Sequence, residues 1–144
     1  MKRIDSFWDS SALVPLCANQ TASAFVRAAW RSKSITVWWG TPVEMMGALC
    51  RLLRGGELST RGFQKAARRM EALRGRWVEV APTERVRELA ETLTRRYTIR
   101  AADALQLAAA LVWSAGHPQQ RPFVCFDRRL AEAAEREGFR IEAG

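Results

Sequence analysis

The chain alternates short apolar runs with longer segments in which apolar residues recur every three or four positions. Runs rich in β-branched and aromatic residues are typical of strands, and Ile-Thr-Val-Trp-Trp at 35–39 is the clearest example. Four other short runs share this apolar character. We predict strands over 4–8, 35–39, 77–80, 122–126 and 139–142.

The segments between these runs have helical periodicity and recognisable ends. Thr41 and Pro42 are typical of an N-cap and a first helical residue, and Gly55 and Gly56 end the same helix. Strands that alternate with helices indicate an α/β fold with a mainly parallel sheet, and 144 residues are enough for one domain with its own core. We predict helices over 10–18, 21–32, 41–54, 59–74, 82–97, 101–115 and 128–137.

Four acidic residues occupy related places in this pattern. Asp9 and Asp127 follow predicted strands, whereas Glu44 and Asp103 lie in the first turns of predicted helices. Ligands of parallel sheets bind beyond the carboxyl ends of the strands, so all four side chains are expected at one edge. Clustered carboxylates raise one another's pKa, and a divalent cation removes that conflict. Hard oxygen ligands favour Mg²⁺ or Mn²⁺.

Each acid also has a plain structural explanation. Carboxylates in first turns complement the helix dipole, and Asp9 or Asp127 could cap the helix that follows. Asp103 is the hardest to explain in this way, because it lies within Ala-Ala-Asp-Ala-Leu-Gln-Leu-Ala-Ala-Ala-Leu. The single histidine, His117, disfavours two-histidine ribonucleases and histidine-ligated zinc sites.

Charge suggests a polyanionic partner. With 23 Lys and Arg against 15 Asp and Glu, the net charge is +8. Segment 51–76 alone holds eight basic and two acidic residues. Its basic residues are solvated helix faces or a track that contacts RNA phosphates. On the second interpretation the candidate RNA-binding residues are Arg51, Arg54, Arg68, Arg69 and Arg100.

Four segments resemble the motifs of the PIN-domain ribonucleases. They read F-W-D-S-S-A-L-V, T-P-V-E-M-M-G-A-L, R-A-A-D-A-L-Q-L-A-A-A-L and F-V-C-F-D-R-R-L-A-E-A-A. Their order and spacing are similar to those of VapC-type toxins from toxin–antitoxin pairs. The resemblance covers nearly the whole chain. It implies a single PIN-like domain over 1–144, with three α/β/α layers around a mainly parallel sheet of four or five strands.

The resemblance also implies an activity, namely a Mg²⁺- or Mn²⁺-dependent endoribonuclease that hydrolyses RNA with a metal-activated water. A cognate antitoxin would inhibit it, and the protein would form a homodimer. Asp9, Glu44, Asp103 and Asp127 would be the catalytic, metal-binding residues, and Ser11 would support Asp9.

One residue departs from the family pattern. Cys125 stands where the family often has Thr or Ser. A thiol is a poorer ligand for Mg²⁺ than a hydroxyl, which weakens that supporting contact.

Two other functions are compatible with the same fold. A non-catalytic RNA-binding or regulatory PIN module would keep the fold, but it would be expected to lose one of the acids. An aspartyl phosphatase would carry a second Asp two residues after Asp9, where this chain has Ser11.

The expected location is the cytoplasm, away from membranes. Asp5 and Asp9 interrupt the apolar run that a signal peptide needs, and the helix near 101–116 is too short and polar to span a bilayer. Three widely spaced cysteines, Cys17, Cys50 and Cys125, are typical of buried thiols in a reducing compartment.

Overall fold

A computed structural model describes residues 4–18 and 23–143. Its five strands form one sheet in the order β3-β2-β1-β4-β5, and all neighbouring strands are parallel. This arrangement confirms the predicted α/β class and the parallel sheet. The strands are β1 (Ile4–Trp8), β2 (Lys33–Trp38), β3 (Val78–Val80), β4 (Pro122–Val124) and β5 (Arg140–Glu142).

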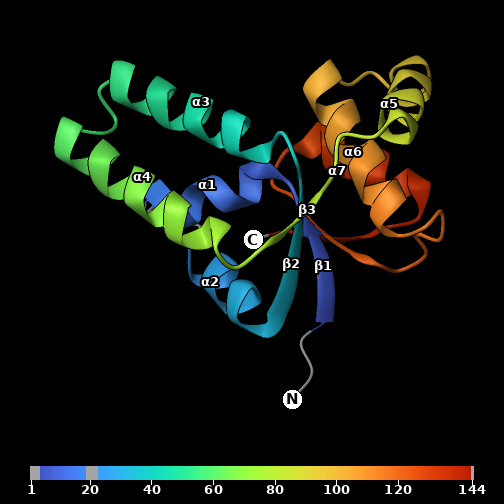
Figure 1. Cartoon of the computed structure of the whole chain (residues 1–144), viewed down its shortest axis with the longest axis horizontal. Helices are drawn as coiled ribbons and strands as arrows, with labels where there is room; N and C mark the ends of the chain where they lie inside the picture. The colour runs from blue at the N-terminus through green and yellow to red at the C-terminus, as the bar shows by residue number, and fades with distance from the viewer. Residues whose placement is uncertain (1–3, 19–22, 144) are drawn as a thin grey trace.

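Helices cover both faces of the sheet (Figure 1). The helices α1 to α4 lie on one side and α5 to α7 on the other, which gives the three layers that the motifs imply. None of the helices in the described part of the chain is both long and apolar enough to cross a membrane. Their bounds are α1 (Ser10–Ala18), α2 (Ser23–Ser32), α3 (Thr41–Arg54), α4 (Thr60–Arg74), α5 (Glu84–Arg96), α6 (Ala101–Trp113) and α7 (Arg128–Glu137).

The central strands contribute side chains to two separate hydrophobic cores, one on each face of the sheet. Phe7 stacks on Phe123 with 5.4 Å between ring centroids, in the core beneath α5, α6 and α7. The next residue, Trp8, faces the opposite way and meets Trp30 of α2 edge-on at 5.8 Å. Successive side chains point to opposite faces of a strand, and both faces are covered here. Strand β1 therefore ends in three consecutive buried residues before Asp9.

The start of α3 differs from the local prediction. Gly40 is the N-cap, and Thr41 begins the helix without making a capping hydrogen bond. Thr41 is fully buried, and its hydroxyl accepts a hydrogen bond from Gln106 of α6 at 3.0 Å. The Thr41 side chain therefore makes a contact with another helix, whereas the capping rule predicts a hydrogen bond to the backbone of its own helix.

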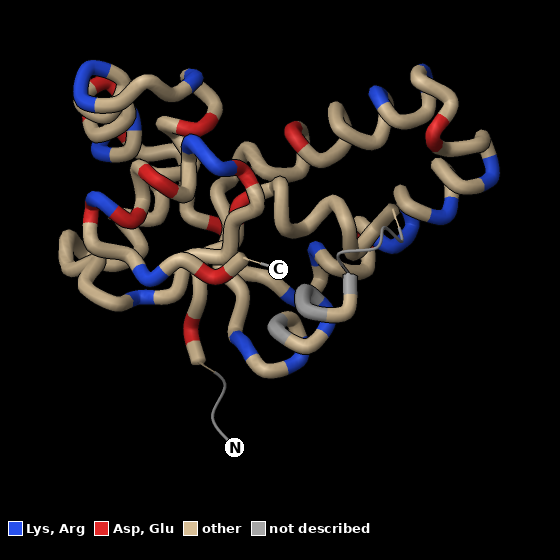
Figure 2. The backbone as a smooth tube through the Cα atoms, turned by 180° about the vertical axis from the view of Figure 1, so that it is seen from behind, with Lys and Arg blue, Asp and Glu red and all other residues tan. Residues whose placement is uncertain are grey.

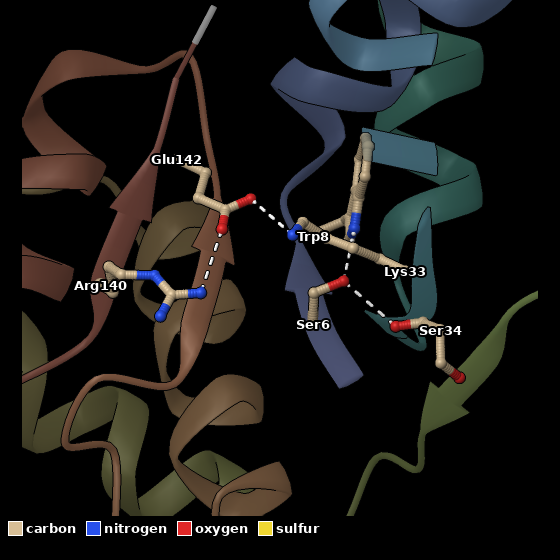
Figure 3. A network of polar contacts seen from close by, with 6 residues as sticks. All are labelled: Ser6, Trp8, Lys33, Ser34, Arg140 and Glu142. Carbon is tan, nitrogen blue, oxygen red and sulfur yellow. Dashed lines mark hydrogen bonds and ion pairs between the residues drawn. The ribbon is translucent and has the colours of Figure 1, made fainter. Parts of the chain in front are cut away.

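A polar network ties the edge strand β5 to β2 (Figure 3). The Lys33 ammonium lies 3.1 Å from the Glu142 carboxylate, and these side chains are only 11% and 18% exposed. Arg140 contacts the other oxygen of Glu142 at 3.2 Å. Beside this pair, the Trp8 indole donates to the Ser6 hydroxyl at 2.9 Å. The nearly buried lysine thus depends on one carboxylate.

We expect Glu142→Gln to destabilise the protein by about 2 kcal/mol, because it leaves the Lys33 ammonium buried without its counter-charge. The matched control is Glu71→Gln, which breaks an exposed pair with Arg74 and should change the free energy of unfolding by less than about 1 kcal/mol. Urea denaturation measures both. Equal effects of the two substitutions would contradict a structural role for the Lys33–Glu142 pair.

Candidate active site

A cleft of about 990 Å³ opens where β1 and β4 end. Its walls come from α1, from α3, from the start of α6 with the preceding loop, and from the start of α7. This edge lies where the order of the strands reverses, since β2 and β3 extend the sheet on one side of β1, and β4 and β5 extend it on the other. Ligands of open parallel sheets bind at such a point. Glu44, Asp103 and Asp127 all line the cleft.

Asp9 directly precedes the lining residues Ser10 and Ser11, but it does not itself line the cleft and is only 3% exposed. Its backbone N–H donates to the Val124 carbonyl at 3.0 Å, which continues the β1–β4 pairing and fixes its position. Its Oδ2 accepts a hydrogen bond from the Ser11 backbone N–H at 3.1 Å. Burial raises the pKa of the Asp9 carboxyl, and the nearby Asp127 charge raises it further.

Glu44 is held from two sides. The Ser10 hydroxyl donates to one carboxylate oxygen at 3.0 Å, and the Gln106 amide donates to the other at 3.3 Å. Burial raises the pKa of Glu44 to about 7, and the charges of Asp9 and Asp103 contribute in the same direction. The orientation of this carboxylate therefore depends on residues from α1 and α6.

Gln106 was not singled out as a site residue in the sequence, although it is the one amide in an apolar segment. It is fully buried one turn after Asp103, and its NH₂ group reaches both Thr41 and Glu44. Its carbonyl oxygen is a buried side-chain atom without a hydrogen-bond partner in the structure. A buried oxygen without a partner costs free energy. The orientation of the amide is therefore set by the hydrogen bonds that its NH₂ group donates to Thr41 and Glu44 of α3. Ser10 was also missed, and its only signal is its position after Asp9.

The remaining two acids of the site are Asp103 and Asp127. Burial raises the pKa of Asp103 to about 6, with further contributions from Asp127 and Asp9. The exposed Asp127 caps α7, because its Oδ1 accepts a hydrogen bond from the Leu130 backbone N–H at 2.9 Å. Three of the four predicted acids thus line one cleft, and the fourth, the buried Asp9, lies close enough to interact electrostatically with each of them.

This acidic group suits a hard divalent cation by its chemistry. The donors are carboxylate oxygens, and the pKa values of Asp9, Glu44 and Asp103 are all raised, so a cation would relieve a conflict that already exists. In the part of the chain that the structure describes, no three acidic, Cys or His side chains form a ready-made ligand cage. Ser10 and Gln106 each donate to one oxygen of Glu44, and the Leu130 N–H donates to one oxygen of Asp127.

Ser11 and Cys125 link the acids to the neighbouring strand. The Phe126 backbone N–H donates to the Ser11 hydroxyl at 2.9 Å. The Cys125 sulfur lies 3.8 Å from Oδ2 of Asp9 and 3.3 Å from the Asp127 carbonyl oxygen. Cys125 is fully buried, and burial raises the pKa of its thiol, so it is a neutral neighbour of Asp9.

Arginines lie along the rim of the cleft. Of the predicted RNA-binding residues, Arg51 and Arg100 line the cleft, whereas Arg54, Arg68 and Arg69 do not. One guanidinium nitrogen of Arg69 instead donates to the Cys17 carbonyl at 3.1 Å. Two rim arginines that were not singled out in the sequence, Arg128 and Arg129, lie at the start of α7.

Apart from Arg51, which lines the cleft, the basic residues of segment 51–76 lie in a separate part of the molecule. The segment covers the end of α3 and the whole of α4, which form an arm that projects from the sheet (Figure 1). Figure 2 shows Lys and Arg positions repeating along this arm. The basic residues that cluster in the sequence therefore belong mainly to this arm, whereas the arginines at the cleft come from several segments.

Comparison with known proteins places the chain in a family. No protein-family model matches the sequence. Ribonuclease VapC45 of Mycobacterium tuberculosis (strain CDC 1551 / Oshkosh) is 31% identical over 140 residues, which cover 94% of this chain and 92% of that protein. Ribonuclease VapC49 of M. tuberculosis (strain ATCC 25618 / H37Rv) matches with the same identity and coverage.

Solved structures share the fold at lower identity. A toxin–antitoxin complex from Klebsiella pneumoniae matches with a TM-score of 0.63 and 15% identity over 88% of this chain and 90% of that chain. FitAcB from Neisseria gonorrhoeae matches with a TM-score of 0.64 and 18% identity over 94% of both chains. VapBC2 from Rickettsia felis, solved bound to a DNA fragment from its promoter, matches with a TM-score of 0.63 and 12% identity over 98% of this chain and 99% of that chain. These structures have the PIN-domain fold of toxins, and together with the two ribonucleases they establish that this chain belongs to the VapC family of PIN-domain ribonucleases.

Proposed function

We propose that this chain is a Mg²⁺- or Mn²⁺-dependent endoribonuclease and the toxin of a toxin–antitoxin pair in the cytoplasm. The observation that carries the proposal is a cleft lined by three acids from separate elements, with the buried Asp9 in electrostatic range of them and arginines along the rim. The ribonuclease names of the two relatives support an RNA substrate. The free thiols of Cys17, Cys50 and Cys125 are compatible with a reducing compartment.

Asp9, Glu44, Asp103 and Asp127 would hold the metal. When bound, Mg²⁺ or Mn²⁺ would polarise the scissile phosphate and lower the pKa of an attacking water. The carboxylates supply the negative charge that balances the cation in a partly buried site.

The chain's own residues position these groups and the substrate. Ser10 and Gln106 orient Glu44, and the Ser11 backbone N–H orients Asp9. Arg51 and Arg100 lie at the rim, where they could contact phosphates on either side of the cleavage point. The Arg100 charge also acts on Asp103, whose pKa it lowers. This division gives an acidic centre for the reaction and a basic rim for binding.

Solved complexes of the same fold support a protein partner. The structures from K. pneumoniae and R. felis are toxin–antitoxin assemblies, and by analogy this chain would bind a cognate antitoxin. The homodimer that the motif resemblance implies is part of the same proposal. A non-catalytic RNA-binding module is the alternative, but the chain keeps all four acids. An aspartyl phosphatase is less compatible, since Ser11 occupies the position of its second aspartate.

We expect Asp103→Asn to reduce Mg²⁺-dependent RNA cleavage by at least about 100-fold, because it removes one of the proposed metal ligands. Excess EDTA should abolish cleavage by the wild-type protein. Glu84→Gln, at an exposed position on α5, is the matched control and should cleave normally. Gel analysis of total cellular RNA measures all three. Undiminished cleavage by Asp103→Asn or in EDTA would refute a metal-dependent mechanism at this cleft.

A second prediction concerns stability. In EDTA, Asp9→Asn should raise the melting temperature by about 2–4 °C, equivalent to roughly 1 kcal/mol in a domain of this size, because it removes a buried charge near other carboxylates. Mn²⁺ at about 100 times its Kd should stabilise the wild type by about 2.7 kcal/mol, and this gain should be largely lost in Asp9→Asn.

The control for this experiment is Asp5→Asn, the same chemical change at an exposed position on β1. It should leave both the metal-free stability and the response to Mn²⁺ close to those of the wild type. Equal stabilisation of Asp9→Asn and Asp5→Asn by Mn²⁺ would argue against Asp9 as a ligand.

A further inference from the structure

A second pocket, of about 410 Å³, lies beside the cleft. One wall is the end of α5 with the loop after it, and the other wall is one face of α7. Thr98, Ile99 and Arg129 line both the cleft and this pocket. A ligand that extends out of the cleft past Arg129 therefore enters the second pocket.

The two walls are tied together by a shared carboxylate. Glu137, at the end of α7, lies 2.8 Å from the Arg96 guanidinium and accepts a hydrogen bond from the Tyr97 hydroxyl. Arg96 and Tyr97 stand at the end of α5. These contacts join the two helix ends across the pocket, so its shape is already formed in the folded chain.

The pocket has uncompensated positive charge. Arg129 and Arg136 line it, both are exposed, and neither has an ion-pair partner among the residues that the structure describes. The acidic residue in the lining, Glu132, is paired with Arg128 at 3.2 Å. Arg129 and Arg136 are two helical turns apart on one face of α7, a rise of about 10.5 Å. Two arginines at this spacing can each contact a separate phosphate of one strand.

We propose that this pocket binds the phosphate backbone of RNA beyond the cleavage point, with Arg129 and Arg136 contacting separate phosphates. The inference rests on the proposed ribonuclease function, because it extends the same substrate from the acidic cleft. Guanidinium groups bind phosphate oxygens in a bidentate manner, and such contacts need only positioned cations. RNA is favoured over an acidic protein segment because Arg129 belongs to the rim of the cleft as well as to the pocket.

The test compares RNA lengths in a cleavage-disabled protein. Fluorescence anisotropy would measure binding of random-sequence single-stranded RNAs of about 4 and about 16 nucleotides to Asp103→Asn, the range that single-stranded sites on small domains span. Adding Arg129→Gln and Arg136→Gln should weaken binding of the longer RNA by about 10-fold at 0.1 M salt. The salt dependence should also fall, by about 0.7 in log–log slope for each lost phosphate contact. The short RNA should lose clearly less affinity.

The matched control removes the same charge elsewhere. Arg85→Gln with Arg87→Gln changes two exposed arginines of α5 that make only surface ion pairs. This control should change the affinity for either RNA by less than about twofold. Circular dichroism would verify that both double variants keep the fold.

Three outcomes would overturn the inference. One is unchanged affinity of the Arg129→Gln/Arg136→Gln variant for the longer RNA, and another is an equal loss in the α5 control. The third is unchanged RNA affinity with weakened binding of an oligoglutamate peptide, which would assign the pocket to an acidic protein ligand. A cleavage assay on the wild-type protein separates the two hypotheses. If the wild type cleaves RNA but the double variant binds the longer RNA normally, only the inference about the second pocket is refuted. If the wild type cleaves no RNA, the proposed function is refuted.

Discussion

The repulsion among carboxylates at the end of a parallel sheet is the constraint on which the rest of the site depends. Asp9 is nearly inaccessible to water, yet it lies within electrostatic range of three other acids. A buried carboxylate is costly unless hydrogen bonds or a counter-charge offset the lost hydration. Ser11 supplies a backbone N–H to Asp9, while Ser10 and Gln106 supply donors to Glu44. Raised pKa values remain after these contacts, so the fold keeps an electrostatic cost that a divalent cation would relieve.

The sequence predicted those parts of this arrangement that depend on local pattern. Strand β1 ends in three buried residues directly before Asp9, and Asp103 interrupts an apolar helix, so both positions are visible from the residues around them. The positioning residues are not visible in this way. Gln106 acts only because α6 packs near α3, and Thr41 gives its hydroxyl to Gln106 and not to the helix start. Local rules assign such polar side chains to capping or to solvent, whereas tertiary contacts decide where they act.

The location of the basic residues is also hard to predict from local sequence. Segment 51–76 contains eight basic residues, but it folds mainly into the arm formed by α3 and α4. From that segment the cleft takes only Arg51, and its other arginines are Arg100 from the loop before α6 and Arg128 and Arg129 at the start of α7. Linear density is a property of neighbouring residues on one helix, whereas the electrostatic potential at a site depends on residues brought together by the sheet topology. The net charge of +8 therefore predicts a class of ligand but not the path that the ligand takes.

The replacement of a hydroxyl by a thiol at Cys125 is compatible with this site for a physical reason. Cys125 is fully buried in the core beneath α5, α6 and α7, where a weakly polar thiol costs less to bury than an unpaired hydroxyl. The Ser11 hydroxyl already accepts a hydrogen bond from the Phe126 backbone N–H, so the chain after β4 has a polar anchor without residue 125. Asp9 in turn accepts a hydrogen bond from the Ser11 backbone N–H at 3.1 Å, and its own N–H donates to the Val124 carbonyl. Because main-chain groups make both contacts, the position of the Asp9 carboxylate depends on the end of β1 and the first turn of α1, and much less on the side chain at position 125.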